Sequence, residues 1–243
     1  MVTDPLPISG RRSGTPGHVR LFDAGLLVLL IVAGCAGNSC LADVKTGLAQ
    51  FDHGDYTHAI TTLTPLAAHG DMSAQYALGL ANYNRLGIKQ DLPAALHWFR
   101  LAAAQGLPEA QYCLGVMYAR GEGVKASQST AVAWFKQAAA GGNAMAYYNL
   151  GVHYAQGEGA YPDLNAALSY MMIAADLGLE PAAEKRDELA QVVGSVRAAA
   201  ARRAADRMKA AIRRPAPVPL PGNETPAPAP KSPAPVHSIQ IRD

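Results

Sequence analysis

The hexapeptide AQYCLG at residues 110–115 decides the fold, because variants of it stand at equal distances on both sides. AQYALG occupies residues 74–79 and AYYNLG occupies residues 146–151, so each copy begins 36 residues after the previous one. Self-similarity at a fixed period of this length is typical of repeat architectures, in which one small unit of structure recurs along the chain. The sequence therefore predicts an array of units rather than one irregular domain.

The register holds in columns well beyond the hexapeptide. The matching positions are Gly79, Gly115 and Gly151; Ala95, Ala131 and Ala167; Trp98, Trp134 and Tyr170; Phe99, Phe135 and Met171; and Gly106, Gly142 and Gly178. These columns define three units, at residues 74–109, 110–145 and 146–181. Ala59 and Leu63 keep the register one period earlier, so a unit with a shorter turn is expected at residues 43–73, with its first helix at residues 44–51.

Each unit is expected to hold two helices joined by a turn. Apolar residues at spacings of +3, +4 and +7 from Ala74 put one face of the first helix against a core. The expected caps and stops of the second helices are Asp91, Ser127 and Asp163 before them and Gly106, Gly142 and Gly178 after them. We predict an all-α fold, an α/α solenoid in which antiparallel helix pairs stack into a superhelix.

The start AxYxLGxxYxxGxGV and the ending AxxWFxxAAxxG of each unit resemble the Sel1-like repeat, a relative of the tetratricopeptide repeat (TPR). AQYCLGVMYARGEGV at residues 110–124 carries nearly the whole signature. The unit at 74–109 departs from it, since Arg85 replaces the first loop glycine and Asn82 replaces a tyrosine. The unit at 43–73 looks more TPR-like. The resemblance covers residues 44–190.

The N-terminal segment at residues 1–42 is interpreted as an export signal. An apolar run at residues 24–36 follows an arginine-containing stretch, and it is shorter than the roughly 20 residues that span a bilayer. Two processing sites compete: cleavage after Ala42, or a lipobox-like VAGC in which Cys35 would be lipidated. We expect a periplasmic or secreted protein, with a lipoprotein anchored through Cys35 as the alternative. Only Cys113 would remain after cleavage behind Ala42, as a small buried side chain.

The C-terminal part divides into a basic segment at residues 182–214 and a proline-rich segment at 215–243. Residues 183–214 hold nine basic and four acidic side chains, a net charge of +5, against seven basic and eleven acidic, a net −4, over 43–182. We expect 182–214 to form one long capping helix. Its expected buried stripe is Leu189, Val192, Val193, Val196, Ala200, Ala204, Met208 and Ala211. The segment 215–243 is expected to be disordered, since nine of residues 215–236 are proline.

Several short patterns resemble catalytic or metal-binding motifs without their context. A phosphate loop binds its anion through backbone N–H groups and a following lysine. In GEG at 121–123 and 157–159 the glutamate would repel that anion, so a structural turn is favoured. KTG at 45–47 has no Ser-x-x-Lys partner, and His53, His58 and His69 lack a metal-ligand spacing. We therefore expect no metal, no cofactor and no catalytic residues.

The function that remains is binding, and we predict a monomeric protein-interaction scaffold of the cell envelope. The alternatives are a regulatory or catalytic subunit acting on cell-wall material, and a structural tether of the envelope. We expect no nucleic-acid partner, because the arginines of 182–214 have no interleaved aromatic residues, and membrane contact only through the anchor at Cys35. Since first helices line the concave wall of such arrays, we expect a peptide or protein partner to contact Tyr76, Tyr83, Asn84, Tyr112, Arg120, Tyr148 and Gln156.

Overall fold

The structure, a computed structural model, describes residues 37–212 and contains ten helices and no strand in that range. The helices are α1 (Gly37–Asp52), α2 (Tyr56–Ala68), α3 (Met72–Asn84), α4 (Leu92–Ala104), α5 (Pro108–Arg120), α6 (Gln128–Ala140), α7 (Ala144–Gln156), α8 (Leu164–Asp176), α9 (Glu180–Val193) and α10 (Ser195–Ile212). None of these described helices is long and apolar enough to cross a bilayer. Cys35, the apolar run at 24–36 and the proline-rich segment lie outside the described residues.

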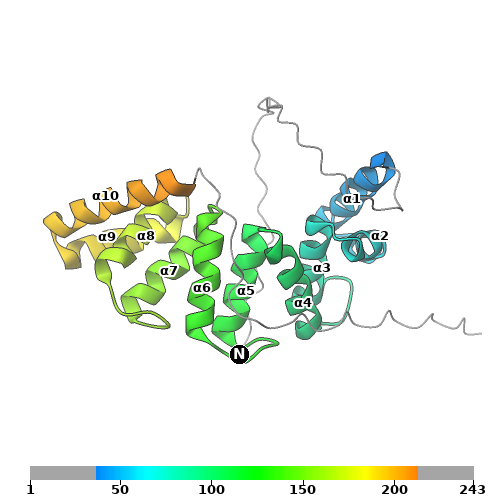
Figure 1. The fold of residues 1–243 in the computed structure, drawn as a ribbon, viewed down its shortest axis with the longest axis horizontal. Helices are drawn as coiled ribbons and strands as arrows, with labels where there is room; N and C mark the ends of the chain where they lie inside the picture. Colours follow the sequence, from blue (N-terminus) through cyan, green and yellow to red (C-terminus); the bar gives the residue numbers. More distant parts are fainter. Residues whose placement is uncertain (1–36, 213–243) are drawn as a thin grey trace, which may run out of the picture.

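The helices form the predicted all-α solenoid. Each odd-numbered helix from α1 to α7 packs on the even-numbered helix that follows it, and these pairs then stack on one another through α2·α3, α4·α5 and α6·α7. Figure 1 shows the pairs following one another along the long axis of the molecule, with α1 and α2 at one end and α9 and α10 at the other. Helix α1 begins at Gly37, seven residues before the expected start at Val44.

The predicted caps of the second helices are confirmed. Asp91 accepts a hydrogen bond from the backbone N–H of Ala94 at 2.9 Å, and Ser127 accepts from that of Thr130 at 3.3 Å. Asp163 accepts from the N–H groups of Asn165 and Ala166 at 2.9 and 3.0 Å. Each cap satisfies donors that have no partner inside the helix, so the three second helices begin at equivalent positions.

The glycine of each hexapeptide sets the distance between the two helices of its unit. A Cβ atom on Gly79 would lie 2.5 Å from the ring of Phe99, and one on Gly115 would lie 2.5 Å from the ring of Phe135. In the fourth unit, at residues 146–181, Gly151 faces the more flexible side chain of Met171. Because both phenylalanines are fully buried, their rings cannot move aside, and only glycine permits this approach.

Replacing Gly115 with alanine should destabilise the protein by about 2 kcal/mol, since the added methyl group overpacks against the Phe135 ring. The matched change Gly151→Ala should be close to neutral, because the end of the Met171 side chain can shift and alanine favours a helix. Urea unfolding followed by circular dichroism measures both. Equal effects of the two substitutions would contradict the assigned contact.

The turns between the two helices of a unit also serve as contacts between units. Gly121 and Gly157 end α5 and α7 in the left-handed conformation, with φ of 72° and 75°, and Arg85 adopts the same conformation at φ 61° after α3. Two residues further on, a Cβ on Gly123 would lie 2.9 Å from the backbone of Leu92, at the start of α4. The GEG segments are therefore structural turns that pack on the preceding unit.

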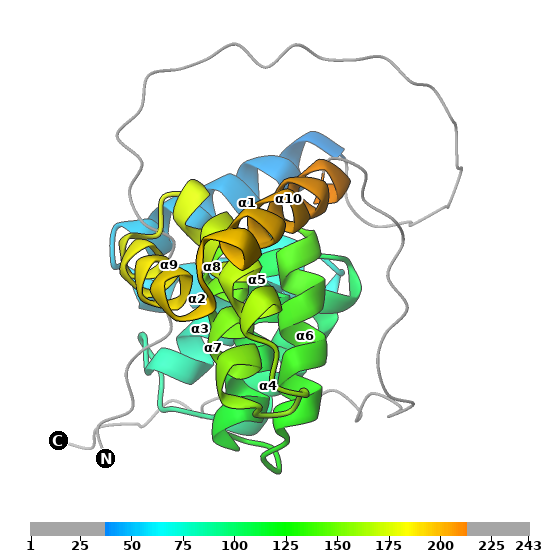
Figure 2. The ribbon, with the colours of Figure 1, turned by 90° about the vertical axis from the view of Figure 1, so that its left-hand side faces the viewer.

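The C-terminal segment is two helices, not the single long helix expected. Gly194, with φ 80° and ψ 163°, separates α9 from α10, and α10 folds back to lie along α8 (Figure 2). The break resets the helical phase, so the predicted buried stripe is confirmed only in part: Leu189, Val193 and Met208 pack against the core, whereas Ala200 and Ala211 are exposed. Val192 and Val196 are 71% and 82% exposed, while the residues turned inward on α10 are Ala198, Ala201, Ala205, Met208 and Ile212.

Helix α10 is held on α8 by small residues and by one carboxylate. Ala201 and Ala205 are buried, and the hydroxyl of Ser169 on α8 donates a hydrogen bond of 3.0 Å to the carbonyl of Ala201. Asp176 at the end of α8 forms ion pairs with Arg202, at 3.1 Å, and with Lys209. Partial burial of Asp176 acts to raise its pKa, but the hydrogen bonds from Lys209 and Arg202 outweigh it and lower the pKa below the ordinary 3.8.

Replacing Asp176 with asparagine should loosen α10 by about 1 kcal/mol, because two partly exposed cations lose a partner whose side chain is 25% exposed. The folded-state pKa is depressed, so this contribution is complete above about pH 4 and is lost as the pH falls through the folded pKa. Hydrogen exchange should show faster amide exchange over residues 195–212 in the variant at pH 7. The comparison variant Ser169→Ala removes the hydrogen bond to the carbonyl of Ala201 and keeps the ion pairs. Unchanged exchange in the Asp176 variant would show that the ion pairs do not hold the helix.

Candidate functional site

The residues predicted to line a groove on the first helices do not form one exposed surface. Tyr83 and Tyr112 are only 4% and 7% exposed, and Tyr76, Asn84 and Tyr148 are half-buried. Arg120 and Gln156, the last residues of α5 and α7, are exposed. Tyr83, one of the residues expected to contact a partner, lies in the core between two units.

Tyr83 joins the second unit to the third. Its hydroxyl donates a hydrogen bond to the carboxylate of Glu122, which is the central residue of the next unit's GEG turn. Burial, followed by the hydrogen bond to Glu122, raises the pKa of Tyr83 well above its ordinary value of 10. The same carboxylate lies 4.0 Å from the guanidinium of Arg120. Arg120 is thus exposed, and its guanidinium lies beside the hydrogen-bonded pair of buried Tyr83 and partly buried Glu122.

The tyrosines of the hexapeptides are packing residues that reach forward to the next unit. The rings of Tyr76 and Tyr112 lie 6.0 and 5.8 Å from those of Phe99 and Phe135 in their own units. The hydroxyl of Tyr76 interacts with the thiol of Cys113, and that of Tyr112 interacts with Asn149, in each case 37 residues along the chain. Burial raises the pKa of both tyrosines, with the neighbouring thiol adding to the effect. These contacts explain why the first helices offer little free surface.

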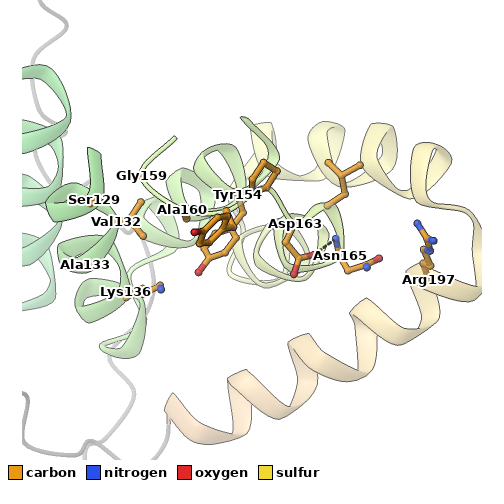
Figure 3. A pocket seen from close by; sticks show the side chains of 13 residues that line it. Ser129, Val132, Ala133, Lys136, Tyr154, Gly159, Ala160, Asp163, Asn165 and Arg197 are labelled. Atoms are coloured by element: carbon orange, nitrogen blue, oxygen red, sulfur yellow. Dashed lines mark hydrogen bonds between the residues drawn. The ribbon is translucent and has the colours of Figure 1, made fainter. Parts of the chain in front are cut away.

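An open groove lies elsewhere, near the C-terminal end of the array. It has a volume of about 730 Å³ and is bordered by α6, by the turn between α7 and α8, and by the start of α10. Figure 3 shows Lys136 on α6 and Arg197 on α10 at opposite sides, with Tyr154, Asp163 and Asn165 between them. The sequence did not indicate this groove, because Arg197 reaches it only through the reversal of the chain at Gly194.

The groove combines aromatic rings with positive charge. The ammonium group of Lys136 lies 5.5 Å from the centre of the Tyr154 ring, which in turn contacts the ring of Tyr170 at 5.4 Å. Burial, together with neighbouring Tyr154, raises the pKa of Tyr170 to about 12. Tyr161, on the turn, is 94% exposed and is the most exposed of the large apolar side chains in the described part of the chain.

The side chains considered for catalysis or metal binding have structural surroundings. Within residues 37–212 no group of three or more histidine, cysteine or acidic side chains could hold a metal ion. His58 bonds to Asp55 at 2.8 Å, and His69 donates to the carbonyl of Pro65 at 2.6 Å. Cys113 is buried, and burial raises the pKa of its thiol far above 9, which disfavours the reactive thiolate.

The 36-residue period, the paired helices and the glycine–phenylalanine contacts define an α/α repeat protein. The Sel1 repeat matches the chain three times, at residues 73–107, 108–143 and 144–179. The chain thus contains three Sel1 repeats, which confirms the resemblance found in the sequence. No protein of curated function matches the chain.

Two solved structures resemble this fold. A Sel1 repeat protein from Oxalobacter formigenes has 29% sequence identity and a TM-score of 0.56 over 59% of this chain and 59% of its own. A protective antigen of uropathogenic Escherichia coli strains, which displays the Sel1-like repeat (SLR) fold, has 34% identity and a TM-score of 0.55 over 58% of this chain and 32% of its own. The chain therefore spans less than two thirds of either relative. Sel1 repeat proteins generally mediate protein–protein interaction.

Proposed function

We propose that this protein is a non-catalytic scaffold of the cell envelope that binds a protein or peptide segment along the loop edge of its repeats. The observation that supports the proposal is the column formed by Asn84, Arg120 and Gln156, the last residues of α3, α5 and α7. The column recurs at the repeat spacing, yet its chemistry changes from unit to unit, whereas the glycine and alanine columns around it stay constant. A constant framework that presents variable side chains is suited to recognising one extended partner.

Two members of this column are suited to direct contact. Arg120 and Gln156 are exposed, and the Arg120 guanidinium lies 4.0 Å from the carboxylate of Glu122, which accepts a hydrogen bond from buried Tyr83. Pre-positioning of this kind lowers the ordering cost of binding. Tyr76, Tyr83, Tyr112 and Tyr148 support the surface from beneath, through packing on the core.

The double substitution Arg120→Ala with Gln156→Ala should weaken partner binding at least tenfold, about 1.4 kcal/mol, and leave the melting curve unchanged. The partner is first identified by crosslinking in the native cell, and its affinity for the purified protein is then measured by calorimetry. Lys45→Ala, which removes one exposed cation from α1 at the other end of the array, is the control. Undiminished affinity of the double variant would place the interaction on another surface.

Export to the envelope is the second part of the proposal, and the apolar run at 24–36 with its arginine flank supports it. Cleavage after Ala42 would leave Val44 and Phe51, two buried apolar residues of α1, in the mature chain. Mass spectrometry of the protein from its native cell should therefore find Asp43 as the N-terminus. An acylated Cys35 would instead identify a lipoprotein, and an intact Met1 would contradict export.

A further inference from the structure

The groove between α6 and α10 is separate from the column at the ends of α3, α5 and α7. Its walls come from α6, α8, α10 and the turn at residues 157–163, and Tyr154 supplies part of its floor from α7. The open form and the volume of about 730 Å³ suit an extended chain better than an enclosed small molecule. The occupant must therefore match the chemistry of these walls.

The turn that carries Tyr161 into the groove is fixed in place. The backbone N–H of Asp163 donates to the carbonyl of Tyr154 at 2.9 Å, and the buried imidazole of His153 contacts the carbonyl of Glu158 through Nδ1 at 3.0 Å. Gly159 packs against the backbone of Gln128, so close that a Cβ would not fit. A fully exposed ring on a rigid turn costs little entropy to bury, which is why tyrosine is enriched at interfaces.

The charges of the groove are unbalanced toward positive. Lys136 and Arg197 are exposed, and neither forms an ion pair with a carboxylate of residues 37–212. Asp163 is the acidic residue that lines the groove, but two N–H groups at the start of α8 already engage its carboxylate. Arg202 and Lys209, further along α10, are paired with Asp176. Unpaired cations are thus present in this groove but not on the side of α10 that contacts Asp176.

We propose that this groove binds an acidic peptide segment of a partner protein. An apolar side chain of the peptide lies against Tyr154 and Tyr161, and its carboxylates pair with Lys136 on one side and Arg197 on the other. The aromatic face beneath Lys136 orients its ammonium group toward the groove. Charge complementarity selects an acidic segment, and the tyrosines supply the apolar contact that a purely electrostatic site would lack.

The test is a selection of random short peptides, displayed on phage, against the full chain and against a Lys136→Gln, Arg197→Gln variant. Peptides selected by the unmodified chain should be rich in Asp and Glu and contain an apolar residue. In fluorescence anisotropy, the best of them should bind the variant at least tenfold more weakly, and replacing its acidic residues with Gln or Asn should have the same effect. The control Arg203→Gln, Arg207→Gln removes two exposed cations from the same helix α10 and should leave binding intact.

Three outcomes would overturn the proposal. Selected peptides without acidic enrichment would refute the charge assignment, and equal loss of binding in the Arg203, Arg207 control would show nonspecific attraction to a basic helix. Binding of vesicles containing anionic phospholipid that depends on Lys136 and Arg197, without peptide binding, would assign the groove to a membrane surface. The Arg120→Ala, Gln156→Ala variant should still bind the acidic peptide, so failure of the loop-edge proposal is distinguishable from failure of this one.

Discussion

The contact between a helix glycine and a buried ring is the constraint on which the rest of the array depends. The contacts of Gly79 with Phe99 and of Gly115 with Phe135 bring the two helices of each unit close together. This spacing positions the other residues that face each other between the two helices. Gly47 makes the equivalent approach to Leu63 in the first unit, although the turn there is four residues shorter. The shared feature of all four units is therefore the helix-to-helix approach, and turn length varies around it.

The repeated part of the fold could be predicted from the sequence, because the same local choices recur in each unit. The caps Asp91, Ser127 and Asp163 act through hydrogen bonds to N–H groups only two or three residues away, which sequence spacing determines directly. Columns of alanine and glycine likewise report positions where helices touch. Local rules and the global fold agree in this region, as expected of a sequence that specifies one structure.

The candidate surfaces were predicted less well, since they depend on contacts between residues that are distant in the sequence. Tyr83 stands where the next two units have Ala119 and Ala155, and it was expected to contact a partner. Its hydroxyl instead donates a hydrogen bond to Glu122, 39 residues away, a contact that the local sequence pattern does not reveal. The groove at α10 depends on the backbone of Gly194, whose extended, positive-φ conformation reverses the chain and shifts the helical phase.

Tyrosines of one unit contact residues 37 positions further along the chain, in the next unit. These contacts favour changes in chain length by whole repeat units. Tyr76 meets Cys113 and Tyr112 meets Asn149, each at the same step of 37 residues. If a whole 36-residue unit were removed or duplicated, each tyrosine would contact the residue at the corresponding position of another unit. The contacts between neighbouring units would then be preserved. An insertion or deletion of another length within the helices would break the series, whereas the turns tolerate changes in length, as the first unit shows. Duplication of whole units is thus a change that this architecture can accept.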